Sequence, residues 1–529
     1  MNTTLRRLTV ASLLAALLLL PTFARAQTAV QSWAQRYNGQ PVGNRRAKAM
    51  AVDASDNVIV TGYSVDNGNY SYYATIKYSG AGTPMWTNLY NQPGNTGDQA
   101  QAIAVDGTNN VIVTGYSLSA SLNYDYVTIK YASAGGGLWT NRYNGPVNGD
   151  DKATAVAVDG SGNVIVTGYS MGTGFNYDYA TIKYSGATGA PIWTNRYNGA
   201  VNGDDKAAAV AVDSGGNVFV TGSSAGAAGL DYATIKYASA GAPVWTNRYN
   251  GPLNSDDLAT ALVVDRGGNV IVTGCSPGTG GYTNYLTIKY SNAGGAIWTN
   301  RYNGLGSGQN GATAVAVDSS SNVVVTGYSL GVAGFDYATI KYSGAGAPAW
   351  TNRYGGTGLL NDFATAVAVD GSGNAFVTGY ATLSGVYYAY ATLGYASNGV
   401  PLWTNYYIGP GTGENEASAV VVDHSGNVLV TGYSLGGGSA YDYATIKYLL
   451  HIPSPVMTGL KLTNGTFRLR VDSVLQPGTL VIEARTNLAP SLAVWSPIYT
   501  NTTPTNVLFY TDPKASNYLR RFYRAFQHP

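Results

Sequence analysis

A repeat of about 53 residues fills most of this 529-residue chain. One copy runs from Ala153 to Trp193 and continues with the letters TNRYNG. One tryptophan and one Thr-Gly pair per copy keep the register. The tryptophans are Trp33, Trp86, Trp139, Trp193, Trp245, Trp298, Trp350 and Trp403, and the glycines are Gly62, Gly115, Gly168, Gly222, Gly274, Gly327, Gly379 and Gly432. Repetition with this period limits the fold to like units stacked in a line or closed into a ring.

Each copy contains four short stretches with the composition of β-strands. They read ATAVAVD, NVIVTGYS, DYATIKYS and PIWTNRYNG, and Gly, Pro, Asn, Asp and Ser bound them. β-Branched and aromatic runs between such turn residues predict strands, and no segment shows helical periodicity. The letters DGSGN between the first two stretches suit a tight hairpin. Four antiparallel strands in each of eight units predict an all-β fold, an eight-bladed β-propeller.

The two ends of the repeat region indicate that the units close into a ring. An isolated Trp stretch, QSWAQRYNG, precedes the first unit, whereas the last unit ends at Ala444–Tyr448 with no Trp stretch after it. We therefore predict that Gln31–Asn38 is the outer strand of the eighth blade. An open solenoid is the alternative, although it requires atypical polar units at both ends.

The chain outside the repeats predicts two further segments. Residues 1–26 have the pattern of a signal peptide, with Arg6 and Arg7 before an apolar run and Ala24-Arg25-Ala26 at the cleavage point. We therefore expect a secreted, extracellular or cell-surface protein, with the periplasm as an alternative. The propeller is expected over residues 27–450. Residues 451–529 alternate in the manner of short strands and predict a small β-sandwich.

Composition excludes several classes of function. The predicted leader carries Arg6, Arg7 and Arg25, so 27 of the 30 basic residues remain against 28 acidic ones. This balance argues against a nucleic acid or an anionic membrane as partner. No later stretch approaches 18 apolar residues, so we expect no transmembrane segment. Three histidines and the single Cys275 exclude a His-based triad, a multi-His metal site and a disulfide framework.

The repeat units DYATIKYSGAGAPVWTNRYNG and AVDGSGNVIVTGYS resemble the SBBP-type bacterial β-propeller repeats. The resemblance covers about 80% of the chain and implies a secreted or cell-surface propeller. It brings no catalytic residues with it. The tail, with TNLAPSLAVWSPI and RRFYRAF, is similar to C-terminal β-sandwich modules of large secreted bacterial proteins, which implies attachment. YSGATGAPIW also resembles the Trp-ending strand of quinoprotein dehydrogenase propellers, but this chain has only three glutamates and one cysteine.

Three loops of the repeat region contain adjacent carboxylates. They are Asp150-Asp151, Asp204-Asp205 and Asp256-Asp257, each between a Trp strand and the next ATAVAVD strand. Paired acids with backbone carbonyls are calcium ligands, so Ca²⁺ is the one cofactor that the sequence suggests. The same carboxylates could instead pair with the adjacent Lys152 and Lys206 or cap the following strand.

Charged residues also recur once per unit within the strands. The lysine of TIKY, the arginine of NRY and the aspartate of YDY return in most units. Regularly placed charges predict ion pairs between blades or side chains that reach the rim. The aspartate of AVD, present in all eight units, is expected to cap the hairpin turn.

Departures from the repeat gather in units seven, eight and one, which ring closure makes neighbours. Gly394 and Tyr406 replace the usual lysine and arginine, and new charges appear in the loops 408–416 and 40–48. We expect these loops on one face and hypothesise a ligand there. Drift near the closure is the alternative. The expected ligand-binding residues are Arg45, Arg46, Tyr387, Tyr388, Glu414 and Glu416.

The sequence therefore favours a secreted, non-enzymatic binding or scaffold protein. We expect a monomer that contacts protein or carbohydrate at the cell surface through Gly/Tyr/Asn-rich loops. A propeller enzyme, either a polysaccharide lyase or a quinoprotein-like oxidoreductase, is the alternative. No acid–base pair or nucleophile stands out in the repeats.

Overall fold

The computed structural model describes residues 28–39, 43–92, 97–305, 308–357, 361–383, 386–411, 413–438, 440–451, 456–461, 467–472, 479–485, 496–501, 507–513 and 522–528. These residues fall into two compact units, one spanning Ala29–Leu450 and another that contains His451–Pro529. The signal peptide expected over residues 1–26 lies outside the described residues. In the described part of the chain, no helix is long and apolar enough to cross a membrane.

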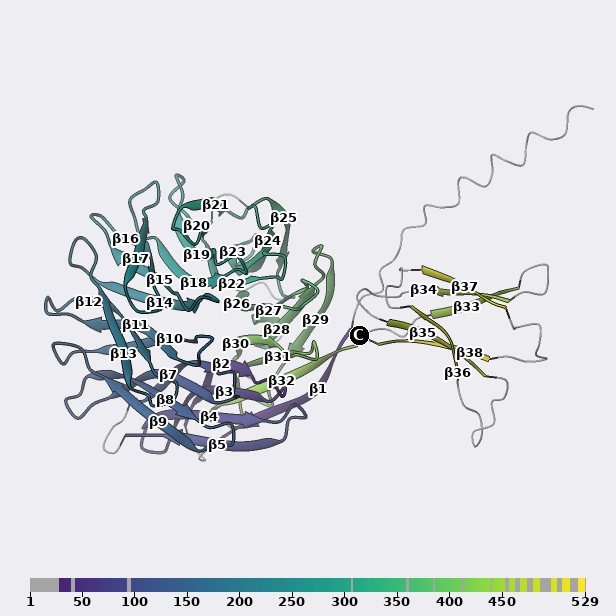
Figure 1. The fold of residues 1–529 in the computed structure, drawn as a ribbon, viewed down its shortest axis with the longest axis horizontal. Helices are drawn as coiled ribbons and strands as arrows, with labels where there is room; N and C mark the ends of the chain where they lie inside the picture. The colour runs from purple at the N-terminus through teal and green to yellow at the C-terminus, as the bar shows by residue number, and fades with distance from the viewer. Residues whose placement is uncertain are drawn as a thin grey trace, which may run out of the picture. The chain divides into compact units, whose positions relative to one another are not determined.

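Eight antiparallel sheets of four strands form the first unit, one sheet per repeat (Figure 1). Blade 1 contains β2 (Arg45–Val52), β3 (Val58–Val65), β4 (Ser71–Tyr78) and β5 (Pro84–Tyr90), and blade 2 contains β6 (Gln99–Val105), β7 (Val111–Leu118), β8 (Tyr124–Tyr131) and β9 (Gly137–Tyr143). Blade 3 contains β10 (Asp151–Val158), β11 (Val164–Met171), β12 (Tyr177–Tyr184) and β13 (Pro191–Tyr197), and blade 4 contains β14 (Asp205–Val212), β15 (Val218–Ala225), β16 (Leu230–Tyr237) and β17 (Pro243–Tyr249). Blade 5 contains β18 (Leu258–Val264), β19 (Val270–Pro277), β20 (Thr283–Tyr290) and β21 (Ala296–Tyr302), and blade 6 contains β22 (Asn310–Val317), β23 (Val323–Leu330), β24 (Phe335–Tyr342) and β25 (Pro348–Tyr354). Blade 7 contains β26 (Phe363–Val369), β27 (Ala375–Leu383), β28 (Val386–Tyr395) and β29 (Pro401–Tyr407).

The eighth blade is assembled from both ends of the repeat region. Its strands are β30 (Asn415–Val422), β31 (Val428–Leu435), β32 (Tyr441–His451) and, outermost, β1 (Thr28–Tyr37). β1 lies beside β32 in Figure 1, and the innermost strands β30 and β2 contact each other, which closes the ring. The Trp33 indole nitrogen donates to the Gly80 carbonyl of blade 1 at 3.2 Å. The predicted eight-bladed propeller closed by the N-terminal strand is thus confirmed.

An apolar cluster fills each boundary between blades, including the closing one. There Val58, Val60 and Ile76 of blade 1 pack with Leu429 and Tyr443 of blade 8. Equivalent clusters lie at the other seven boundaries. The closing boundary is therefore packed like the others, because the strand sequences on both of its sides are the same.

One tyrosine per blade explains part of the high tyrosine content. Tyr179 is fully buried in β12, and its hydroxyl donates to the Ala233 carbonyl of blade 4 at 3.2 Å. The same bond joins each blade to the next around the whole ring, from Tyr73, Tyr126, Tyr232, Tyr285, Tyr337, Tyr390 and Tyr443. A buried hydroxyl needs such an acceptor, so these tyrosines fix the spacing of neighbouring blades.

A buried ion pair fixes the hairpin turn of most blades. Lys183 Nζ lies 2.9 Å from Asp159 Oδ2, and both side chains are 5% exposed. Asp159 also accepts bonds from the amides of Ser161 and Asn163, which confirms it as a turn cap. The lysine in addition donates to the Ser239 carbonyl of blade 4. The ion pair lies within one blade, and only the bond to a carbonyl reaches the next. Equivalent pairs are Lys77–Asp53, Lys130–Asp106, Lys289–Asp265, Lys341–Asp318 and Lys447–Asp423.

Blade 7 departs from this pattern because of the ring closure. In seven blades the tryptophan indole donates to a carbonyl just after the third strand of the next blade, as in Trp139 to Gly186. Blade 8 has no hairpin there, since β32 and β1 come from opposite ends of the chain. Among the described residues, the buried indole nitrogen of Trp403 has no hydrogen-bond partner, and the Trp403 ring stacks on Phe376. A lysine at position 394 would lack the same acceptor, and the chain has Gly394.

The second unit contains two antiparallel sheets of three strands. One sheet has the order β33 (Val456–Lys461), β34 (Phe467–Asp472) and β37 (Val507–Asp512). The other has the order β36 (Ser496–Asn501), β35 (Thr479–Arg485) and β38 (Phe522–His528). Buried side chains of β34 and β35 form one apolar cluster with partly buried residues of the other four strands. Both sheets thus share one core.

Candidate functional site

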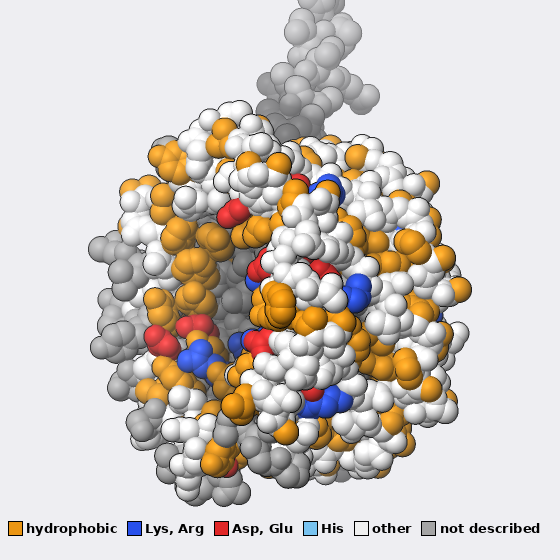
Figure 2. Space-filling view, turned by 90° about the vertical axis from the view of Figure 1, so that its left-hand side faces the viewer, with side chains coloured by type: hydrophobic (Ala, Val, Ile, Leu, Met, Phe, Trp, Pro, Cys, Tyr) orange, Lys and Arg blue, Asp and Glu red, His pale blue; other side chains and the backbone are white. Residues whose placement is uncertain are grey.

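One position on the innermost strands differs between blades, although the alanine after it and the Thr-Gly pair opposite that alanine are the same in all eight blades. This position directly precedes the alanine that pairs with the glycine of the Thr-Gly pair. In blade 3 it is Lys152, because Ala153 pairs with Gly168. We call the eight residues at this position the collar. They are Arg46, Gln99, Lys152, Lys206, Leu258, Gly311, Phe363 and Glu416. Figure 2 shows a hollow in the face that it draws, with charged and hydrophobic side chains around it.

Collar residues contact aromatic rings of the preceding blade. Lys152 Nζ lies 4.3 Å from the centre of the Tyr124 ring, and Lys206 Nζ lies 4.7 Å from that of Tyr177. Phe363 packs against Phe335 with ring centres 5.2 Å apart. The collar therefore presents cations over aromatic faces on one arc of the ring and apolar groups on another.

The structure brings four of the six predicted ligand-binding residues to this collar. Arg46 and Glu416 are collar residues, and the Arg46 guanidinium lies 4.1 Å from the Tyr433 ring. Glu414 accepts a hydrogen bond from the Tyr441 hydroxyl at 3.1 Å. Tyr388 packs against Tyr380 with ring centres 5.0 Å apart. The predicted grouping of the loops of units seven, eight and one on one face agrees with these contacts.

Burial and neighbouring charges shift the acid–base properties of this sector. Burial raises the pKa of Glu416, and Glu414 raises it further, while the Tyr433 hydroxyl, Arg46 and Lys48 lower it; the net pKa is above the ordinary value. Burial lowers the pKa of Lys48. Burial thus disfavours the charged form of each group, and a nearby opposite charge would favour it.

Arg45 does not lie on this surface. Its side chain is 2% exposed, and its Nη1 lies 3.7 Å from Asp442 Oδ1 of blade 8. Along β2 the burial of successive side chains alternates, as the two-residue period of a strand requires, with Arg45 buried and Arg46 partly exposed. That alternation was the signal in the sequence that could have separated them. Tyr387 belongs to β28, but its side chain is outside the described part of the structure.

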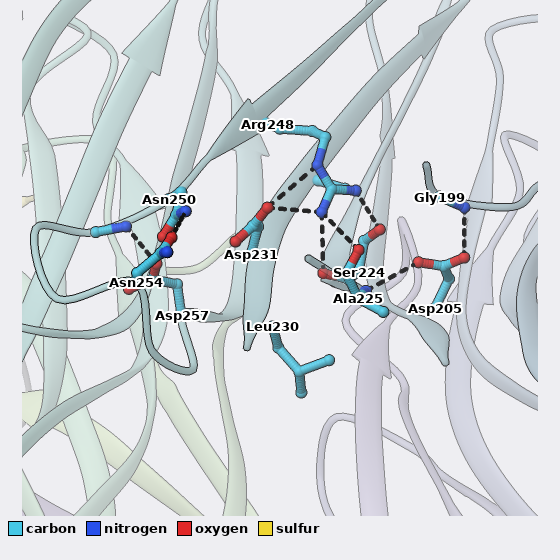
Figure 3. A network of polar contacts seen from close by, with 12 residues as sticks. Gly199, Asp205, Ser224, Ala225, Leu230, Asp231, Arg248, Asn250, Asn254 and Asp257 are labelled. Carbon is cyan, nitrogen blue, oxygen red and sulfur yellow. Dashed lines mark hydrogen bonds and ion pairs between the residues drawn. The ribbon is translucent and has the colours of Figure 1, made fainter. Parts of the chain in front are cut away.

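In each of the three loops with adjacent carboxylates, the two aspartates accept hydrogen bonds from different segments of the chain. Asp204 accepts from the Tyr177 amide of blade 3, whereas the buried Asp205 accepts from the amides of Gly199 and Ala225. Figure 3 shows Asp205 in this role beside the network of Arg248, Asp231 and Ser224. The pairs Asp150-Asp151 and Asp256-Asp257 are arranged in the same way.

Among the described residues, no group of three or more His, Cys, Asp or Glu side chains is placed to hold a metal ion. Calcium therefore stays a prediction. A calcium titration that follows the thermal unfolding temperature of the protein would test it, because a bound ion stabilises the folded state.

The opposite ends of the innermost strands carry a second concave feature. A cavity of about 270 Å³ lies against blades 5, 6 and 7. Its lining includes Val264, Arg266, Asp318 and Asp370. Asp318 is already paired with Lys341 at 3.0 Å, so this carboxylate serves the turn.

Comparison with known proteins identifies the architecture. No family model matches the chain. The uncharacterized WD repeat-containing protein L264 of Acanthamoeba polyphaga mimivirus is 25% identical over 414 residues, which cover 63% of this chain and 29% of that protein. This chain thus spans less than a third of the relative's length.

Two solved structures of Sqt1 from Chaetomium thermophilum are also similar. Sqt1 alone gives a TM-score of 0.51 at 10% identity, over 80% of this chain and 99% of that chain. Sqt1 bound to the N-terminus of the ribosomal protein L10 gives 0.50 at 10% identity, over 79% and 98%. At this identity the matches show the fold alone, a β-propeller like that of WD-repeat proteins. The SBBP-type assignment and the type of C-terminal module stay predictions.

Proposed function

We propose that this protein is a secreted, non-enzymatic scaffold that binds a partner protein at the collar. The observation that carries the proposal is the variation of the collar beside an alanine and a glycine that are the same in all eight blades. Structural positions repeat because the same contacts recur, such as the Tyr179 hydroxyl bond at every boundary and the Lys183–Asp159 pair within most blades. The collar lies outside those contacts, and its side chains differ in charge, size and polarity.

The chemistry of the collar suits a polypeptide. Three cations, Arg46, Lys152 and Lys206, occupy one arc, and Leu258 and Phe363 occupy another. A partner with acidic and apolar side chains would meet complementary groups on both arcs. Sqt1, which has the same fold, was solved with the N-terminus of a ribosomal protein bound. Secretion rests on the predicted signal peptide, and carbohydrate binding through exposed tyrosines is the competing proposal.

The experiment compares capture of a partner by two variants of the full chain. The test variant carries Arg46→Ser, Lys152→Ser and Lys206→Ser. The control carries Arg266→Ser, an exposed arginine in the turn at the other end of an innermost strand. Proteins captured from culture supernatant and cell-surface extract are compared by mass spectrometry.

We expect a protein that the wild type and the control retain and that the triple variant loses. Equal capture by all three would contradict a role for the collar. A glycan array run in parallel addresses the competing proposal, since binding of a glycan but of no protein would favour carbohydrate. A propeller enzyme stays an alternative without assigned residues.

A further inference from the structure

Four blades carry the same pair of tyrosines beside the collar. One ring comes from the second strand and the other from the start of the third. Their centres lie 5.0 to 5.2 Å apart in edge-to-face contact. The pairs are Tyr116–Tyr124, Tyr169–Tyr177, Tyr380–Tyr388 and Tyr433–Tyr441. Such a pair presents two electron-rich faces to whatever lies above it.

A cation from the following blade covers three of these pairs. Lys152 lies 4.3 and 5.3 Å from the rings of blade 2, and Lys206 lies 4.7 and 5.7 Å from those of blade 3. Arg46 lies 4.1 and 5.2 Å from the rings of blade 8. The two lysines also have a carboxylate two residues earlier, Asp150 at 3.4 Å and Asp204 at 2.9 Å. The chain therefore fills these three sites with its own side chains.

The fourth pair, Tyr380–Tyr388 of blade 7, has acids where the others have a cation. Glu416 occupies the collar position of Lys152, and Glu414 occupies that of Asp150. The charges of both glutamates help to raise the pKa of the Tyr380 hydroxyl, and Glu414 also accepts a hydrogen bond from the Tyr441 hydroxyl of blade 8 at 3.1 Å. In the described part of the chain, no lysine or arginine stacks on Tyr380 or Tyr388, and no cation lies within 4.0 Å of either glutamate. The nearby Arg46 is instead placed over Tyr433 and Tyr441.

We propose that Tyr380, Tyr388, Glu414 and Glu416 form a binding site for a lysine or arginine side chain of the partner protein. The rings and the carboxylates attract the same charge, and the three equivalent sites in this chain each hold an ammonium or a guanidinium. An incoming cation would complete at blade 7 the arrangement that Lys152 completes at blade 2. This inference deepens the proposed function, on which it rests for the cation to belong to a protein.

The test uses small side-chain probes and two variants of the full chain. The probes are N-acetyl-lysine methylamide, N-acetyl-arginine methylamide and the uncharged N-acetyl-glutamine methylamide. Binding is followed by saturation-transfer NMR. Glu416→Lys supplies the cation in cis, as in blades 3 and 4. Glu416→Lys combined with Lys206→Glu moves the empty arrangement to Tyr169 and Tyr177, where Asp204 takes the place of Glu414, and leaves the net charge as in the wild type.

We expect the wild type to bind the two cationic probes and not the glutamine probe. Glu416→Lys should weaken that binding by about tenfold or more, in line with the strength of a partly buried cation–π contact. The double variant should regain it. An unfolding temperature within about 2 °C of the wild-type value shows that a variant folds, because a shift of that size corresponds to a small change in the free energy of unfolding.

Two outcomes overturn the inference: no preference for the cationic probes in the wild type, or undiminished binding by Glu416→Lys. Glu414→Gln with Glu416→Gln gives a second measurement that keeps the side-chain shapes, and it should also weaken binding. The proposed function fails separately. If the probes bind as expected but no protein is captured at the collar, the cation site stands and the scaffold proposal falls.

Discussion

The buried pair of Lys183 and Asp159 allows a sharp test of how the ring is held together. The perturbation is Lys183→Met, which keeps an unbranched side chain of nearly the same length and removes the charged end. The matched control is Lys206→Met. The Lys206–Asp204 pair has the same 2.9 Å separation, but its side chains are 42% and 45% exposed, against 5% for both members of the buried pair. The two pairs thus match in distance and differ in burial, and each lysine has one further kind of contact, Lys183 to the Ser239 carbonyl and Lys206 to tyrosine rings.

The expected magnitudes follow from that burial. Removing one partner of a buried ion pair costs about 3–5 kcal/mol, because the other charge stays buried without compensation. An exposed pair is screened by water and contributes at most about 1 kcal/mol. Lys183→Met also loses the bond to the Ser239 carbonyl of the next blade. The unit Ala29–Leu450 has an unfolding entropy of roughly 0.9 kcal/mol/K at about 2.1 cal/mol/K per residue, so its unfolding temperature should fall by about 3–6 °C.

Differential scanning calorimetry of the full chain measures both variants. We expect a clear decrease for Lys183→Met and a change of about 1 °C or less for Lys206→Met. Adding Asp159→Asn to Lys183→Met removes the uncompensated charge while leaving an oxygen for the turn amides of Ser161 and Asn163. The double variant should therefore be more stable than the single one. Equal unfolding temperatures for Lys183→Met and Lys206→Met would refute the reasoning.

Three further predictions concern the closure, the buried acids and blade 7. A chain that starts at Gly39 lacks β1, so we expect aggregation in size-exclusion chromatography, and a peptide of residues 28–38 should restore a cooperative unfolding transition; wild-type behaviour of the truncated chain would show another mode of closure. Burial raises the pKa of Asp151 above its ordinary 3.8, partly offset by Ser170 and the Gly145 amide. Its folded form therefore holds a proton more tightly than the unfolded chain, and the wild type loses stability as pH rises from 3.8 through the folded pKa. Asp151→Asn introduces the residue that blades 6 and 8 have as Asn310 and Asn415. We expect this variant to gain stability relative to the wild type across that pH window, which urea titrations at pH 4 and pH 7 measure. A smaller gain at pH 7 than at pH 4 would contradict this prediction. Gly394→Lys should destabilise the ring by about 1–3 kcal/mol, because an added Cβ meets the Trp403 ring at 2.7 Å and the ammonium, even when paired with Asp370 of its own turn, would lack the carbonyl of the next blade; calorimetry showing a stabilised protein would exclude this explanation of blade 7.

The seam shows where prediction from the sequence succeeds. The isolated stretch before the first unit and the missing stretch after the last one predicted the eighth blade, and β1 lies beside β32. The same missing hairpin explains why Gly394 and Trp403 depart from the pattern. Part of the asymmetry that the sequence linked to a ligand thus has a structural cause, namely closure, whereas Arg46, Glu414 and Glu416 keep no such explanation.

The candidate site shows where prediction from the sequence stops. The sequence selected Arg45 and Arg46 together, although the alternation of the strand buries one of them. It treated Lys152 and Lys206 as partners of neighbouring acids, yet both also cover tyrosines of the preceding blade. The tyrosines that they contact lie about 28 residues earlier in the chain. The spacing in the sequence does not predict which aromatic side chains the packing of neighbouring blades places beneath these lysines.

The amino-acid sequence alone determined the strands, their number per unit and the need for a borrowed strand, because these depend on local composition and on a period that repeats along the chain. The tertiary structure decided which groups of neighbouring blades meet: the buried tyrosine hydroxyls and the turn lysines with carbonyls of the next blade, and the collar cations with aromatic rings of the preceding blade. Contacts between blades depend on the angle at which successive sheets pack, and that angle is a property of the closed ring as a whole.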